Sequence, residues 1–194
     1  MTGLMVLVAG LVLVGSALLW AVGMRNGLVR LRGLVTESWR QIDAELDRRH
    51  ELIPPLVSAA AGHAPAERAT LEAVVAARAA AMEPGAPVGR QALAEGALSS
   101  ALGRLFAIAE AYPALRADPD FQALAAELTD TEDRVAAGRR FYNANVSELN
   151  ARVESLPSAP FARLLRMRPA DFFEVTDPAG AQAPVANGGT GPSR

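Results

Sequence analysis

The 194-residue sequence contains no cysteine and no lysine, and only 5% of its residues are aromatic. Without cysteine, the chain has no disulfide, no thiolate nucleophile and no sulfur ligand for a metal ion. The formal net charge is −2, so a nucleic-acid partner has no electrostatic support. All 19 basic residues are arginines, which, beside abundant alanine, we attribute to a composition bias of the genome. Alanine-rich segments with few aromatic or β-branched runs favour an all-α fold.

An uncharged apolar run from Gly3 to Gly23 opens the chain. As a helix that rises ~1.5 Å per residue, it would span roughly 31 Å, about one hydrocarbon core. The alternative is a cleaved signal peptide, with Ala21-Val22-Gly23 as its cleavage site. Against this, no positive segment precedes the run, and the run is longer than the apolar region of a signal peptide. Trp20 suits the membrane interface. We therefore predict a transmembrane anchor over residues 1–24.

The orientation follows from the arginines near this run. None precedes it, whereas Arg25, Arg30, Arg32 and Arg40 follow it closely. Because positive residues favour the cytoplasmic side, we predict a single-pass protein with its N-terminus outside and the rest of the chain in the cytoplasm.

The apolar residues beyond the anchor recur at steps of three and four, which is typical of amphipathic helices. The predicted helices cover residues 28–61, 66–82, 89–112 and 119–156. The apolar residues expected to face inward on them include Val75, Leu93, Leu98 and Leu156. Pro54-Pro55 interrupts the first pattern, so we expect a kink or a restart near Leu52. Asp118-Pro119 combines a capping side chain with a proline at the first helical position, and predicts the start of the last helix.

These helices predict a single N-terminal transmembrane helix followed by an antiparallel up-and-down four-helix bundle over residues 25–156. Its first helix is long and kinked, and its last helix is long with a coiled-coil-like seam, in which Thr131, Gly138 and Asn145 are the small or polar members. A closing segment rich in Phe and Arg follows over residues 157–177, and a disordered Pro/Gly-rich tail over 178–194. In an alternative arrangement, the first two bundle helices are nearly continuous and form a three-helix rod.

Two groups of residues are candidates for a structural or binding role. If the first and last helices lie antiparallel and flush, a polar layer that fixes their register is expected at mid-height; the alternative is separate, solvated ions. The residues of this layer are Arg48, Arg49, Glu110, Glu132, Arg139 and Asn143. The second group would lie at the membrane surface; the alternative is that Phe161, Leu164, Phe172 and Phe173 close the end of the bundle. This group consists of Trp20, Arg25, Phe161, Arg163, Arg166 and Arg168.

The sequence shows no constellation for catalysis. His50 and His63 lack the spacing of metal ligands, and Ser99-Ser100 has no neighbouring His or Lys that would activate a nucleophile. No glycine-rich loop follows a strand, as a phosphate-cradling motif requires. We therefore expect no catalytic residue, no metal and no cofactor.

The chain resembles the LemA family from about residue 26 to residue 174. The resemblance depends on ordered blocks along the chain. These are Asn26-x-Leu28-Val29-x-Leu31-Arg32, Trp39-x-Gln41-Ile42-Asp43, Arg48-Arg49-His50-x-Leu52-Ile53-Pro54, Glu72-Ala73-Val74 with Ala77-Arg78, Leu102-Gly103-Arg104-Leu105-Phe106 through Pro113, Leu128-x-Asp130-Thr131-Glu132-Asp133-Arg134-Val135, Arg139-x-Phe141-Tyr142-Asn143, Asn150-x-Arg152-Val153 and Phe172-Phe173-Glu174. Pro55 and Gly33 each replace an asparagine that is usual in the family.

The resemblance implies a bacterial inner-membrane protein with a short outside N-terminus, one membrane helix and a helical domain, and no agreed enzymatic activity. Our first functional hypothesis is a non-enzymatic scaffold or adaptor at the cytoplasmic face, with unidentified protein partners or self-association. The second is a protein that assembles on lipid and organises or remodels the membrane. A ligand-binding or hydrolytic bundle ranks third. The lipid bilayer is a partner in the first two hypotheses, and nucleic acid is a partner in none.

Overall fold

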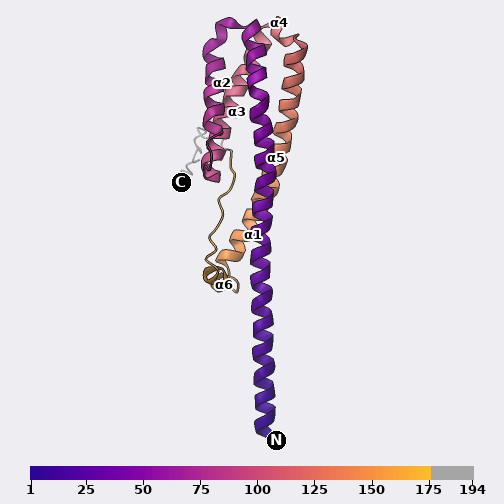
Figure 1. Ribbon diagram of the computed structural model, residues 1–194, viewed down its shortest axis with the longest axis vertical. Coiled ribbons are helices and arrows are strands. Elements are labelled where there is room, and N and C mark those ends of the chain that lie inside the picture. The colour runs from indigo at the N-terminus through magenta and orange to yellow at the C-terminus, as the bar shows by residue number, and fades with distance from the viewer. Residues whose placement is uncertain (176–194) are drawn as a thin grey trace, which may run out of the picture. The chain divides into compact units, whose positions relative to one another are not determined.

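The computed structural model describes residues 1–175, and in this range helix is the only regular secondary structure (Figure 1). The all-α prediction is confirmed. The predicted tail and the last two residues of the predicted closing segment lie outside the described residues. The helices, in chain order, are α1 (Thr2–His63), η1 (Pro65–Glu67), α2 (Arg68–Ala81), α3 (Val88–Ala111), α4 (Pro113–Arg116), α5 (Pro119–Glu154) and α6 (Ala159–Leu164).

Helix α1 has 62 residues and unites the predicted anchor with the first predicted bundle helix. It continues through Pro54 and Pro55, so the helix does not restart near Leu52. The sequence missed the four-residue helix α4, because Pro113 predicted only an end of the preceding helix. A proline is favourable at the first position of a new helix, which is the position that Pro113 occupies.

Two helices of the described chain, α1 and α3, are long and apolar enough to cross a membrane, by length and composition alone. In the most apolar 18-residue stretch of α1 no residue is buried, whereas 44% of the corresponding stretch of α3 is buried. The N-terminal end of α1 extends away from the other segments of its unit (Figure 1). The structure thus supports one exposed N-terminal apolar helix, while α3 has the burial of a core helix.

The described residues divide into two compact units. The first consists of residues 1–52 and 125–173. In it α1 and α5 run antiparallel, because Ser38 accepts a hydrogen bond from Asn145 at 3.3 Å while Glu45, further along α1, pairs with Arg134, further back along α5. The buried apolar residues on α1 include Leu28, Leu31, Val35, Ile42 and Leu46, and those on α5 include Leu128, Tyr142, Val146, Leu149 and Val153.

One glycine lets the two helices approach closely. A Cβ added at Gly138 of α5 would lie 3.1 Å from Cγ1 of Ile42, a side chain that is only 1% exposed. Nearby, Trp39 contacts the rings of Tyr142 and Phe173, with centroids 5.5 and 5.3 Å apart. The small residue that the sequence placed in the seam of the last helix therefore faces a bulky partner.

The second unit consists, within the described range, of residues 53–124 together with 174 and 175. Here α2 and α3 pack side by side, joined by a six-residue connection. The largest buried side chains include Ile53, Leu56, Leu98, Leu102, Leu105 and Leu115. The Asp118 carboxylate accepts hydrogen bonds at 2.9 Å from the backbone N–H groups of Asp120 and Phe121. The predicted start of the last helix is therefore confirmed.

Three apolar residues predicted to face inward are exposed. Val75 is 50%, Leu93 63% and Leu156 81% exposed. Near the start of α3 the buried face consists of Ala92, Glu95 and Gly96, so the predicted stripe is wrong at Leu93, whereas from Leu98 onward its leucines are buried as predicted. Leu156 is exposed because α5 ends two residues before it.

Candidate functional site

Ion pairs connect α1 with α5 in the first unit. An Nη of Arg49 donates to a carboxylate oxygen of Glu132 at 2.9 Å, and Arg134 reaches Glu45 at 3.0 Å. The Arg49 side chain is 4% exposed, whereas that of Glu132 is 43% exposed. The structure therefore brings together the arginine and the carboxylate that the helix register placed at mid-height, with only the arginine buried.

The other residues predicted for the polar layer lie elsewhere. Arg48 is about half exposed and pairs with Glu127. Glu110 belongs to the second unit, where it forms an exposed pair with Arg116 at 3.4 Å. Arg139 is partly exposed. The contact between α1 and α5 is thus a row of pairs with different burial rather than one closed layer.

Asn143, the remaining predicted member of the layer, holds the chain that follows α6. We call residues 166–173 the strap. The Asn143 side-chain amide donates to the Phe173 carbonyl at 3.2 Å and accepts from the Phe173 N–H at 3.0 Å. Asn150 binds Ala170 in the same two-way manner, at 3.0 and 2.8 Å. Each asparagine therefore satisfies both backbone groups of one strap residue.

We call each of these two-way contacts between an asparagine and the strap a bracket. The spacing of the two asparagines explains why both brackets form. Two asparagines seven residues apart on a helix are separated by about 10.5 Å, and three residues of extended chain cover about 10 Å. The hydroxyl of Tyr142 donates to the carbonyl of Asp171, between the two brackets, at 2.8 Å. Burial, and secondarily the Asp171 charge, raises the pKa of Tyr142. Sequence reasoning missed Asn150; two asparagines at seven-residue spacing inside a helix, where this residue is disfavoured, were the available signal.

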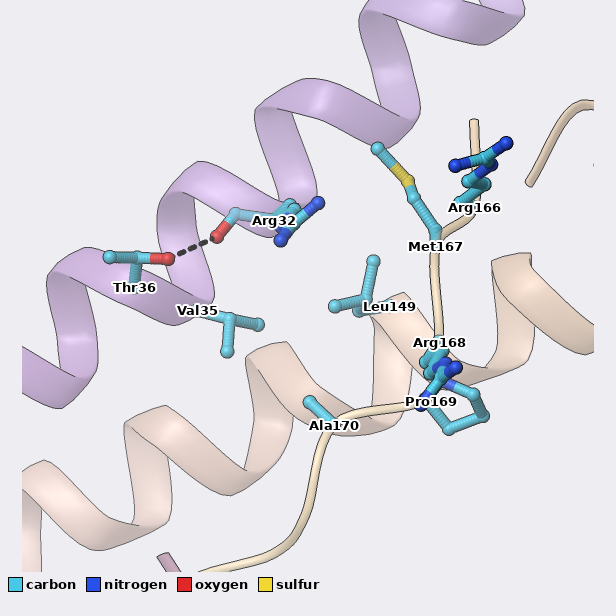
Figure 2. A pocket seen from close by; sticks show the side chains of 9 residues that line it. All are labelled: Arg32, Val35, Thr36, Leu149, Arg166, Met167, Arg168, Pro169 and Ala170. Atoms are coloured by element: carbon cyan, nitrogen blue, oxygen red, sulfur yellow. Dashed lines mark hydrogen bonds between the residues drawn. The ribbon is translucent and has the colours of Figure 1, made fainter. Parts of the chain in front are cut away.

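The strap and α1 enclose a cavity of about 320 Å³ (Figure 2). Arg32 extends from α1 toward the strap, and Met167 crosses the gap in the opposite direction. Arg166 and Arg168 are the other charged residues of the lining. Among residues 1–175, none of these three arginines forms an ion pair. Two of the predicted membrane-surface arginines therefore line a pocket together with one arginine that the sequence did not single out for it.

The other membrane-surface candidates lie close to the apolar run. Trp20 and Phe161 form an edge-to-face contact with ring centroids 5.5 Å apart, so α6 lies beside the end of that run. Arg25 and Arg163 are exposed. Of the residues expected to close the bundle in the alternative hypothesis, Phe173 is fully buried, whereas Leu164 is 80% exposed. The segment therefore combines features of both alternatives.

A model of the LemA family matches residues 38–187. The chain belongs to the LemA family. The resemblance inferred from the sequence is thereby confirmed. Among curated proteins, this LemA family member is similar to the magnetosome proteins MamQ 1 and MamQ 2 of Paramagnetospirillum magneticum, with 33% identity over 87 residues. It is 32% identical, over the same length, to the magnetosome protein MamQ of Magnetospirillum gryphiswaldense.

Each of these matches covers 45% of this chain and 32% of the relative, so the similarity extends over about a third of the length of the curated relatives. Family membership, the exposed N-terminal apolar helix and the similarity to MamQ together indicate a membrane-associated helical protein. In the described part of this LemA family chain, no three His, Cys, Asp or Glu side chains are grouped so as to hold a metal ion.

Proposed function

We propose that this LemA family protein is a single-pass protein of the bacterial inner membrane whose helical domain lies at the cytoplasmic face and acts as a scaffold or adaptor for other proteins. The N-terminus lies outside in this proposal, and the bilayer takes up the apolar part of α1. The partners are other proteins or further copies of the same chain.

The observation that carries the proposal is the change of character along α1. The helix is uncharged and apolar from Gly3 to Gly23, and none of the residues in its most apolar stretch is buried by the described part of the chain. Arginines begin at Arg25, and the strap brings further arginines to the same end of the unit. Because cytoplasmic flanks of membrane helices are rich in arginine, this asymmetry favours a cytoplasmic domain.

We further propose that the long helices form an antiparallel up-and-down bundle, as expected from the sequence. Two observations support it: α1 and α5 run antiparallel in the first unit, and α2 and α3 pack side by side across a short connection in the second. Short connections between helices are typical of antiparallel neighbours.

The ion pairs between α1 and α5 support a scaffold role. Arg49 with Glu132, and Arg134 with Glu45, join helix to helix, which fixes register more than it adds stability. Such pairs keep α1 and α5 in register. We therefore propose that the domain presents helical surfaces to partners and is not an enzyme.

Reporter fusions test the placement. Alkaline phosphatase and green fluorescent protein are fused in turn after residue 60 of the full-length chain and expressed in a bacterium. We expect fluorescence without phosphatase activity, and a membrane-bound protein that resists carbonate extraction. Phosphatase activity at this position, or release of a mature chain that begins after residue 23, would contradict the proposal.

A second function, lipid-dependent self-assembly that organises the membrane, is favoured by the similarity to MamQ, since those relatives are named as magnetosome proteins. Light scattering of the full chain in nanodiscs distinguishes the two. A defined small oligomer that captures partners by crosslinking in native membranes supports the adaptor. A polymer that grows only when anionic lipid is present supports self-assembly.

A further inference from the structure

We infer that the cavity between α1 and the strap is a binding site for a single phosphate group, supplied by the headgroup of an anionic phospholipid or by a small soluble phosphate compound. This deepens the proposed function, because it names a ligand at the membrane-facing end of the domain. It depends on the proposed membrane placement only for the lipid as the source of the phosphate.

The charges of the lining carry the inference. Arg32 lines the cavity from α1, Arg166 and Arg168 line it from the strap, and no Asp or Glu of residues 1–175 contributes to the lining. Elsewhere in the described chain, arginines such as Arg49 and Arg134 are paired with carboxylates. Three arginines around one cavity that form no ion pair within the described part of the chain leave donors for an anion. Guanidinium groups match phosphate oxygens in a two-donor geometry, which makes arginine the usual residue for phosphate recognition.

The strap is held in place before any ligand arrives. Both backbone groups of Ala170, a lining residue, are bonded to the Asn150 side chain at 2.8 and 3.0 Å. Arg166 has φ of +52° at the end of α6, where the N–H groups of Arg166 and Met167 bond back to the carbonyls of Arg163 and Ala162 and cap the helix. The capped and bracketed backbone positions the arginines in advance, which lowers the entropy cost of binding.

The size and polarity of the cavity favour a lipid headgroup as the source. Its volume of about 320 Å³ equals that of roughly ten water molecules in the liquid, more than one phosphate needs. The lining also includes the apolar side chains of Val35, Leu149 and Met167. A phospholipid has apolar groups directly beside its phosphate, so it would use both parts of the lining.

The position along α1 is compatible with this source. Arg32 lies nine residues beyond Gly23, or about 13 Å along the helix axis. Long side chains on a helix lean toward its N-terminal end, here the end that would enter the membrane. The contact of Trp20 with Phe161 likewise keeps α6, which directly precedes the strap, beside the end of the apolar run.

The test compares matched arginines in the full-length protein. In neutral detergent, dioctanoyl phosphatidylglycerol is titrated and lipid-bound chain is counted by native mass spectrometry. The pocket variants are Arg32→Gln and Arg166→Asn; asparagine is chosen because it tolerates the left-handed backbone. The controls are Arg30→Gln and Arg163→Gln, which remove the same charge from neighbouring positions that do not line the cavity. Circular dichroism verifies that all four variants keep their helix content.

We expect one lipid to bind saturably per chain, with affinity reduced about tenfold or more in the pocket variants and less than about threefold in the controls. Equal losses in all four variants would show that only charge density matters and would overturn the site, as would the absence of binding to the parent chain. Competition with inorganic phosphate separates the sources. Displacement of the lipid by millimolar phosphate assigns the site to a soluble phosphate compound, and resistance assigns it to the lipid.

The outcomes also separate this inference from the proposed function. If the reporters place the domain outside the cytoplasm but the pocket variants lose binding selectively, the proposed placement is wrong and the phosphate site stands. If the placement is as proposed but pocket and control variants behave alike, the site is wrong and the adaptor proposal stands.

Discussion

The pair between Arg49 and Glu132 gives a quantitative prediction, because its two members are buried to different extents. The Arg49 side chain is 4% exposed and that of Glu132 43% exposed, with 2.9 Å between the bonded atoms. Removing the carboxylate takes a charged acceptor away from a guanidinium that water hardly reaches. Removing the arginine leaves a carboxylate that water already solvates. The two substitutions should therefore have unequal costs.

Breaking a fully buried pair by removing one partner costs about 3–5 kcal/mol, and replacing the whole pair with packed apolar residues is often nearly neutral. Because Glu132 is half exposed, we expect Glu132→Ala to lower the free energy of unfolding by about 2–3 kcal/mol. Arg49→Met, which keeps the length and apolar stem of the side chain, should cost about 1 kcal/mol or less. The double variant should resemble Arg49→Met alone, since the carboxylate has little effect once the guanidinium is gone.

Thermal unfolding of the full chain, followed by circular dichroism at 222 nm in one detergent, measures these differences. For a protein of this size, 1 kcal/mol corresponds to about 2–4 °C in Tm. We expect Glu132→Ala to lower Tm by about 5–10 °C and Arg49→Met by less than about 4 °C. Equal shifts, or a larger shift for Arg49→Met, would refute the argument from unequal burial.

Three further predictions concern packing, the strap and pH. Gly33→Ala should raise the free energy of unfolding by about 0.5–1 kcal/mol, because its added Cβ meets no atom within 4 Å. Gly138→Ala should bring no gain, because its Cβ would lie 3.1 Å from a buried isoleucine; equal Tm shifts for the two variants would contradict this. Asn150→Ala should speed hydrogen exchange of the strap amides about tenfold or more, and the exposed control Ser147→Ala should not; unchanged protection would show that the bracket is dispensable. Because the pKa of Tyr142 is raised in the folded state, the stability from its neutral hydroxyl is full below the unfolded-state pKa of about 10 and is lost as pH rises through the folded-state pKa. Tyr142→Phe should therefore lose less Tm than the parent between about pH 9 and 11, and identical slopes of Tm against pH would refute this.

Many features of the fold could be predicted from local patterns. The steps of three and four in the apolar residues indicated the helices, because a helix that buries one face requires this period. Asp118-Pro119 located the start of α5 to the residue, since a capping carboxylate and a proline act on backbone groups next to them in sequence. Arg49 and Glu132 were brought together by counting residues along two antiparallel helices, which succeeds because the rise per residue is constant.

Features that depend on a partner surface were predicted poorly. Leu93 was predicted to face inward, but at that end of α3 the buried residues are Ala92 and Gly96, and which face of a helix is covered depends on the neighbour. Glu110 was expected to join Arg49 and Glu132 in one polar layer, but it lies in the second unit and pairs with Arg116. Nothing in the local sequence around either residue states which helix it meets.

The sequence by itself determined the helical class, the uncharged apolar run, the family and the register of α1 against α5, because each of these follows from period, composition or spacing along the chain. Only the tertiary structure decided that Asn143 and Asn150 bracket an extended strap, and that this strap brings Arg166 and Arg168 to Arg32. The path of a non-helical segment is set by the few side chains that satisfy its backbone, and these lie twenty to thirty residues away in the sequence.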